Sequence, residues 1–377
     1  MNRIQRLREV FREAYRNVAT GTARPLIALF AFALVVGAAG FAQARGVVGV
    51  AQDALTWQQQ GSAVQIITFE NQIDGRQCDA LASLPGIGAA GAVRQIDSVR
   101  LAALPSVPIS TFEVTPGLGE LLGVTAGPGQ EIGGVWLSED LARVIGITDT
   151  ELPLVIQNVE GAGRWAHGGT FGVAGVYSSP AGGQSSPLDY AVLSPAAPVG
   201  SFDSCWALLW PESSQTISLL PLSVEVTSTA PGEHRQTPRL AQLNTTAGTS
   251  FDAAGRLDAL PTWPLTVAAV GFAAVLGFGL TYTRKLELAS ALHAGVRKPS
   301  LLIQLGIEAL YWLIPAVALV IPAAFWAAAR ENPDPTWIAF YPALRTTALA
   351  VLAALLTVLI AALLVREKHL FRHFKQR

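Results

Sequence analysis

Charged residues are scarce in this chain of 377 residues: 14% are Asp, Glu, Lys or Arg, whereas 51% are hydrophobic. A soluble domain has about a quarter charged residues, so the composition is typical of a protein with membrane-spanning segments. A helix needs about 20 predominantly apolar residues to cross a bilayer. Four apolar segments predict spans at residues 25–45, 263–283, 300–329 and 345–365.

Lysine is rarer still: the chain has four, all outside the long central region. Residues 1–25, 284–300 and 366–377 together hold 15 Lys or Arg against four acids, a net charge of +11. Residues 43–262 hold nine Arg against 20 acids, a net charge of −11. The near-neutral total therefore hides a strongly polarised molecule.

This polarity predicts how the chain crosses the membrane, because basic segments beside a span stay in the cytoplasm. Residues 1–24, the loop 284–299 and the basic tail 366–377 are predicted to be cytoplasmic, so that both termini lie inside. The large segment 46–262 and the short loop 330–344 are predicted to be extracytoplasmic. Residues after the first span, up to Gln60, extend its helix outward as a stalk.

The N-terminal segment is predicted to be an amphipathic helix on the cytoplasmic membrane surface. Apolar side chains recur at helical spacing between arginines that suit anionic headgroups. The apolar positions are Ile4, Leu7, Phe11, Ala14, Tyr15 and Val18. Two alternatives stay open: a plain basic tail, and a secretory signal with its cleavage site at residues 42–44.

The extracytoplasmic segment has the alternation of strand and helix signals expected of an α+β domain. Strands are predicted over residues 64–70, 92–101, 154–159, 171–177, 216–222 and 222–227. Short helices are predicted from Cys78 to the Pro85-Gly86 stop and after Ser138, a good N-cap. Residues 178–200, rich in Pro, Gly and Ser, are predicted to form a mobile loop.

Cysteine is also scarce, since Cys78 and Cys205 are the only two, and both lie in the predicted extracytoplasmic segment. Oxidation is permitted on that side of a bacterial membrane, so one disulfide between them is the simplest expectation. A metal site is not expected, because His167 and His234 alone accompany them, without ligand spacing.

Several motifs of catalysis are missing from the sequence. No phosphate-binding loop G-x-x-x-x-G-K-[ST] occurs, so any nucleotide hydrolysis must come from another chain. No G-x-S-x-G elbow or comparable nucleophile spacing occurs either, and no catalytic residues are predicted. The acidic character of the large segment argues against nucleic-acid binding.

The segment from Arg284 to Leu310 carries a family resemblance. It resembles the pattern R-E-I-G-x-L-R-A-L-G-A-S, followed by a span containing E-A, of the MacB/FtsX-like permeases of ABC transporters. Glu287, Gly295, Glu308 and Ala309 match that pattern without a gap, whereas Leu292 stands where the family usually has Arg. In the large segment, Gly134–Ile147 is similar to the "V-S-E-x-L-A" helix region of the family's extracytoplasmic domain.

The resemblance implies the fold and the partners. It implies an α-helical bundle of four transmembrane helices, with a MacB-like α+β extracytoplasmic domain inserted between spans 1 and 2. It places the chain in a bacterial cytoplasmic membrane, paired with a second permease, identical or different, and with ABC ATPase subunits that bind ATP and Mg. It assigns contact with the ATPase to the segment that includes Arg284, Glu287, Leu288, Leu292 and Gly295. An extracytoplasmic accessory protein is a further partner that it leaves open.

Three functions fit this organisation. The first is a non-catalytic permease subunit that couples a partner's ATP hydrolysis to extracytoplasmic movement, for export or extraction of a peptide, lipid-like or antibiotic substrate. The second is a transmembrane regulator that activates a cell-wall hydrolase. The third is a membrane-anchored receptor without an ATPase.

One acidic residue, Glu308, falls inside a predicted span. Glu308 lies within about two turns of the cytoplasmic end of the third span, where a carboxylate can be solvated or can pair with a basic residue. Arg284 and Arg297 are the candidate partners. A role of Glu308 in conduction is the alternative.

Overall fold

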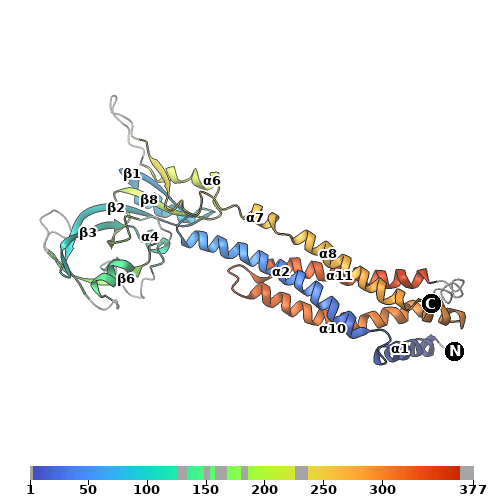
Figure 1. Cartoon of the computed structure of the whole chain (residues 1–377). Helices are drawn as coiled ribbons and strands as arrows, with labels where there is room; N and C mark the ends of the chain where they lie inside the picture. Colours follow the sequence, from blue (N-terminus) through green and yellow to red (C-terminus); the bar gives the residue numbers. More distant parts are fainter. Residues whose placement is uncertain are drawn as a thin grey trace. The chain divides into compact units, whose positions relative to one another are not determined.

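The computed structural model describes residues 3–124, 134–147, 153–157, 168–179, 186–225 and 237–365, with side chains from residue 10 onward. The chain separates into two compact units (Figure 1). One unit holds Met1–Asp53 and Asp252–Arg377 and is helical in its described part. The other, Ala54–Phe251, combines a sheet with short helices.

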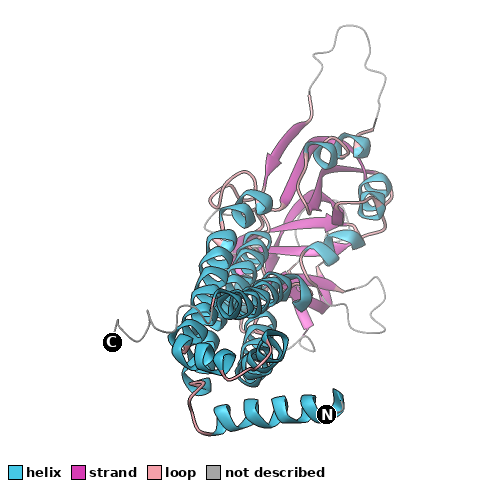
Figure 2. Ribbon diagram, turned by 90° about the vertical axis from the view of Figure 1, so that its right-hand side faces the viewer, coloured by secondary structure: helices cyan, strands magenta, loops and turns pink. Residues whose placement is uncertain are grey.

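The helical unit contains four helices that are long and apolar enough to cross a membrane. These segments are Pro25–Gln59, Ala253–Thr283, Lys298–Ala329 and Thr336–Leu364. The helices of the unit are α1 (Arg3–Ala19), α2 (Pro25–Gln59), α7 (Ala253–Ala259), α8 (Thr262–Thr283), α9 (Lys285–His293), α10 (Lys298–Ala329) and α11 (Thr336–Leu364). Helices α2, α8, α10 and α11 form the bundle, and α1 lies beside it as a separate helix (Figure 2). Helix α2 continues without a break from the predicted first span through the predicted stalk.

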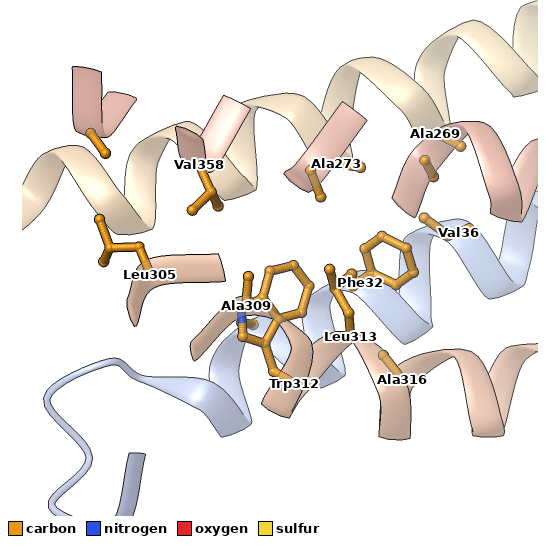
Figure 3. Packing of buried hydrophobic residues seen from close by; sticks show 14 of the residues in the cluster. Phe32, Val36, Ala269, Ala273, Leu305, Ala309, Trp312, Leu313, Ala316 and Val358 are labelled. Carbon is orange, nitrogen blue, oxygen red and sulfur yellow. The ribbon is translucent and has the colours of Figure 1, made fainter. Parts of the chain in front are cut away.

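Small side chains dominate the centre of the bundle. Half of the 20 buried residues in its main cluster are alanine. The others are Leu, Val and two large aromatic residues, Phe32 and Trp312, whose rings lie edge to face, 5.8 Å between centroids (Figure 3). Helices α8 and α11 approach closely at Gly277, where an added Cβ would lie 2.6 Å from the carbonyl oxygen of Ala354. Small residues permit this approach of two backbones.

A closed set of polar side chains joins three helices inside the bundle. The Gln43 amide of α2 donates to the Thr266 hydroxyl of α8 over 3.0 Å. Thr346 of α11 donates to the Gln43 oxygen over 3.0 Å and lies 2.8 Å from Thr266. Every member is buried and paired, as an apolar environment requires.

Two segments differ from the sequence prediction. The charged segment predicted as a loop at 284–299 is largely the helix α9. Helix α11 begins at Thr336, inside the segment 330–344 that was predicted to be a loop. The prediction began the span after Pro342, yet this proline lies within the helix.

In its described parts, the second unit is built on nine strands in one hydrogen-bonded set. They are β1 (Val64–Asp74), β2 (Ile87–Leu101), β3 (Leu104–Val114), β4 (Val135–Ser138), β5 (Pro153–Ile156), β6 (Gly169–Tyr177), β7 (Ala191–Pro195), β8 (Ser201–Leu209) and β9 (Arg239–Gln242). Strands β3, β7, β4, β6, β5 and β2 pair in that order, and β2 also pairs with β3, so these six strands close into a ring. Strand β2 is shared with an antiparallel sheet in the order β2-β8-β1-β9.

Short helical segments cover this strand framework (Figure 2). They are α3 (Gly75–Ala80), η1 (Leu81–Ser83), α4 (Pro116–Leu121), α5 (Glu139–Ile145), α6 (Ser214–Ile217) and η2 (Leu220–Ser223). The predicted N-cap is present, since the Ser138 hydroxyl accepts from the Leu141 N–H at the start of α5. The buried side chains are mainly Val, Ile, Leu and aromatic residues in three clusters.

Two sequence predictions fail in this unit. Residues 216–227 were predicted to be strands, but they begin with α6 and η2. A capping box between Ser213 and Thr216 opens α6, and Pro221 lies in η2. The predicted loop 178–200 contains the buried strand β7 in its described part.

Candidate functional site

The candidate site lies at the joint between α8 and α9. Arg284 is both the C-cap of α8 and the N-cap of α9, so it occupies the corner between the two helices. Helix α9 ends in a tight turn in which the N–H groups of Gly295 and Val296 bond back to the carbonyls of Leu292 and Ala291. Gly295 has φ +89°, a conformation that favours glycine after a helix end.

Arg284 binds two carboxylates at once. Its Nε and one terminal nitrogen donate to the two oxygens of Glu287 over 2.9 and 2.7 Å. Its other terminal nitrogen donates to Oε2 of Glu308 in α10 over 2.5 Å. The Arg284 side chain is 12% exposed and that of Glu308 is 5% exposed. The guanidinium thus ties the first turn of α9 to the neighbouring bundle helix.

The second oxygen of Glu308 is also paired. Oε1 accepts from the Asn17 amide of α1 over 2.7 Å and from the Gln304 amide of α10 over 3.2 Å. A buried carboxylate needs such partners, because an unpaired charge is costly in an apolar environment. Elements α1, α8, α9 and α10 are therefore joined through one acidic side chain.

A small cavity of about 20 Å³ lies beside this ion pair. It is lined by Ala23, Leu280, Thr281, Arg284, Leu305, Glu308, Ala309, Trp312 and Val358. This volume is about what one water molecule needs. The ion pair therefore has little free space around it.

Arg284 and Glu287 each stabilise the charged form of the other. Burial lowers the pKa of Arg284, but the hydrogen bonds and charges of Glu287 and Glu308 outweigh burial and raise it overall. The hydrogen bonds from Arg284 hold the pKa of Glu287 below its ordinary value, although partial burial opposes this. Both side chains are therefore charged at neutral pH.

The five residues predicted to contact an ATPase differ in burial. Arg284 and Leu288 are largely buried within the unit, and Leu292 packs against the bundle core. Glu287 and Gly295 are exposed. Burial leaves Arg284 and Leu288 suited to hold α9 in place, whereas the exposed positions can face another protein.

Sequence reasoning missed three residues of this region, and it noted a fourth, Gln304, without pairing it with Glu308. Ser290 and His293 are exposed on the same side of α9 as Glu287, at a spacing of three residues that an α-helical prediction would have revealed. Asn17 and Gln304 both bind Glu308. Gln304 precedes Glu308 by one helical turn, which is a readable signal, whereas the contact of Asn17 depends on the tertiary fold.

The Glu308 side chain pairs with Arg284, one of its two predicted partners. In the other unit, Cys78 and Cys205 form a disulfide with a Cα–Cα distance of 5.8 Å. No group of three His, Cys, Asp or Glu residues that could hold a metal ion occurs within the described parts of the chain.

Neither a protein-family model nor a curated protein matches the sequence. Three solved structures are similar to part of it. They are the periplasmic region of MacB from Actinobacillus actinomycetemcomitans (12% identity, TM-score 0.30), a domain of a permease-type protein from Porphyromonas gingivalis (17%, 0.29), and the extracellular domain of the ABC-type transporter YknZ from Gram-positive bacteria (10%, 0.27). The matches cover 44%, 41% and 41% of this chain, and 83%, 78% and 87% of the respective structures. Similarity at this level does not place the chain in a family.

Proposed function

We propose that this chain is the non-catalytic permease subunit of an ABC transporter. The observation that carries the proposal is the joint at Arg284, which links a short helix with an exposed face to two long apolar helices. The same segment holds the residues that match the permease pattern, Glu287, Gly295, Glu308 and Ala309. Ordered surfaces of this kind suit the transfer of a movement from a partner protein into a helix bundle.

The contacts around Arg284 suggest how a displacement of α9 would be transmitted to the bundle. Leu288 and Ala289 anchor α9 on the bundle core. Arg284 makes α9 move together with α10 through Glu308, because release of the arginine would leave a buried carboxylate short of a charged partner. In this proposal ATP closes a pair of ATPase subunits, and the closed pair favours one of two arrangements of the bundle.

The remaining parts follow from the same proposal. Both termini and α9 lie in the cytoplasm of a bacterium, and the unit Ala54–Phe251 lies outside the cytoplasmic membrane. A second permease, identical or different, completes the assembly, and ATP and Mg are bound by the ATPase. Bundle movement then acts on the outer unit to export or extract a peptide, lipid-like or antibiotic substrate.

The partner is tested by purifying the full chain from its native membranes in mild detergent. An ABC ATPase is expected at about one copy per chain. Ser290→Trp places a large side chain on the exposed face of α9 and is expected to abolish this recovery. Asp334→Trp, an equally exposed substitution between α10 and α11, is the control and is expected to retain the ATPase. Recovery of the ATPase with both variants would contradict the proposal. So would failure to recover an ATPase with either the parent chain or the control.

The membrane orientation is tested by thiol labelling of spheroplasts with a membrane-impermeant maleimide. Val199→Cys, exposed in the outer unit, is expected to react in intact spheroplasts. Ser290→Cys is expected to react only after the membrane is permeabilised. The reverse order of labelling would invert the proposed topology and remove α9 from any cytoplasmic ATPase.

A further inference from the structure

Over residues 10–19, helix α1 buries few side chains against the bundle. Among its described side chains, residues 10–19, Ala14 is the single buried one. Tyr15 remains 61% exposed, and its ring lies 6.4 Å from that of Tyr311 in α10. An element with so little buried apolar surface opens more easily than the rest of a fold.

Among the described side chains of α1, Asn17 makes a polar contact with α10. Its amide donates to a carboxylate, and hydrogen bonds to charged groups are stronger than those between neutral groups. The carbonyl of Asn17 also accepts from the Thr22 hydroxyl over 3.0 Å, in the turn that follows α1. Asn17 therefore joins the end of α1 both to Glu308 and to the connection that leads into α2.

That connection is a tight turn with two residues in the left-handed conformation. Gly21 has φ +75° and Arg24 has φ +46° between α1 and α2. The left-handed conformation is unfavourable for a residue with a side chain, so the position of Arg24 is strained. Ala23, from the same connection, lines the small cavity beside Arg284 and Glu308. Movement of α1 about this connection would widen that pocket, which is already partly open.

We propose that α1 is a releasable latch and that Asn17 is the positioning residue through which it holds Glu308, and through Glu308 the side chain of Arg284. When α1 is docked, Glu308 is fully paired and Arg284 is fixed at the start of α9. When α1 is released, Glu308 loses the Asn17 donor, the partly open pocket beside it widens, and Arg284 is held less firmly.

The latch would regulate the site proposed above, since α9 is the segment assigned to the ATPase. The latch proposal rests on the proposed function only in this regulatory effect on an ATPase. The physical link from Asn17 to Arg284 belongs to this chain alone, so it is tested without an ATPase. A missing ATPase would remove the proposed function and leave the latch intact.

Docking of α1 is measured by disulfide crosslinking in the full-length chain carrying Tyr15→Cys and Tyr311→Cys, in detergent and under mild oxidation. Asn17→Asp sets a second carboxylate against Glu308 and is expected to slow crosslinking at least fivefold. Asn17→Ala is expected to slow it about threefold. Gln304→Ala removes the other donor to the same oxygen from α10, and is the matched control with an expected change below twofold.

A donor and acceptor exchange tests whether the Asn17 effect runs through Glu308. Adding Glu308→Gln to Asn17→Asp lets the new amide donate to the new carboxylate, and is expected to restore crosslinking to within twofold of the parent. Parental crosslinking in Asn17→Asp, equal slowing by Asn17→Ala and Gln304→Ala, or failure of the exchange overturns the latch.

The relay to Arg284 is read by its rate of modification with phenylglyoxal, followed by peptide mass spectrometry. Asn17→Asp is expected to accelerate modification of Arg284 at least threefold. Arg143, exposed in the other unit, serves as the internal reference and is expected to keep its rate. Slowed crosslinking with an unchanged rate at Arg284 would show that α1 is released without affecting the joint, and would overturn the relay.

Discussion

The bundle and the α+β unit are filled with different side chains. Alanine makes up half of the 20 buried residues of the bundle core, but only five of the 35 buried residues in the three clusters of the α+β unit. The α+β unit is filled instead by residues such as Tyr177, Phe202 and Leu118. The two units therefore solve the packing problem with side chains of different size.

The difference in side-chain size follows from the elements that each unit packs: helices against helices in the bundle, and layers against a sheet in the α+β unit. Helices in an apolar environment gain little from burying large apolar side chains, so they gain stability by bringing backbones close over small ones. A sheet and its covering layers lie about 10 Å apart and need large side chains to fill the space. The two units are thus expected to fail under different substitutions.

The largest expected effect lies in the α+β unit and concerns its covalent closure. Replacing both Cys78 and Cys205 with Ser opens a loop of 127 residues and is expected to cost about 4 to 5 kcal/mol by the chain-entropy model. Hydrogen exchange of the full chain in urea resolves the two units. Peptides of the α+β unit should lose protection at lower urea, while those of the bundle keep their midpoint. A shared shift would mean that the two units unfold together.

The second prediction compares the destabilisation caused by breaking one ion pair in each unit. In the bundle, Arg284→Ala leaves Glu308 without its charged partner and is expected to cost about 3 to 5 kcal/mol. In the α+β unit, Arg94 pairs with Glu113 and both side chains are partly exposed. Arg94→Ala is expected to cost less, about 1.5 to 3 kcal/mol. The same exchange experiment measures both. Equal costs would show that burial does not set the strength of these pairs.

The sequence was informative where one property decides the structure. Apolar length sufficed to locate four long helices, and the two cysteines had one possible intramolecular pairing. It failed where local and tertiary preferences compete. Thr216 is β-branched and favours a strand, but its capping box with Ser213 and the following Pro221 produce helical turns. Strand β7 was hidden in a Pro- and Gly-rich segment because its partner strands, β3 and β4, are distant in sequence.

In the candidate site, too, some residues could be predicted from the sequence and others could not. Arg284 and Glu308 could be singled out because their charges stand beside or within apolar segments, and Glu287 because it matches the permease pattern. Asn17 could not, because its contact spans 291 positions of the chain and a neutral amide gives no composition signal. The buried orientation of Leu288 follows only from the helix α9, which the prediction had treated as a loop.

A third effect, of moderate size, tests the small-residue packing within one bundle helix. Gly277→Ala puts a methyl group against the backbone of α11 and is expected to destabilise the bundle by about 1 to 3 kcal/mol. Gly271→Ala, on the same helix, meets open space. It is expected to be neutral or to stabilise by up to about 1 kcal/mol, since Ala is the better helix former. Thermal unfolding in detergent should give a lower midpoint for Gly277→Ala and an unchanged or higher midpoint for Gly271→Ala. Shifts in the same direction would contradict close packing at Gly277.

The smallest expected effect separates the units by pH. Burial raises the pKa of Asp79 in the α+β unit, and the charge of Glu120 adds to this, although hydrogen bonds from Thr115 and Gly117 oppose both. A raised folded pKa means that the contribution of Asp79 to stability is full below its unfolded value, ordinarily 3.8, and is lost as pH rises through the folded value. Asp79→Asn should therefore gain stability relative to the parent chain as pH rises from 4 towards neutrality.

Glu287 in the bundle has the opposite sign. Its pKa is lowered by the hydrogen bonds from Arg284, so its contribution is present above the unfolded value, ordinarily 4.5, and is lost as pH falls through the folded value. Glu287 is half exposed, which limits this contribution to about 1 kcal/mol or less. Glu287→Gln should therefore lose stability at neutral pH and match the parent chain at the acidic end. Parallel pH profiles for the two variants would mean that neither carboxyl titrates as its surroundings require.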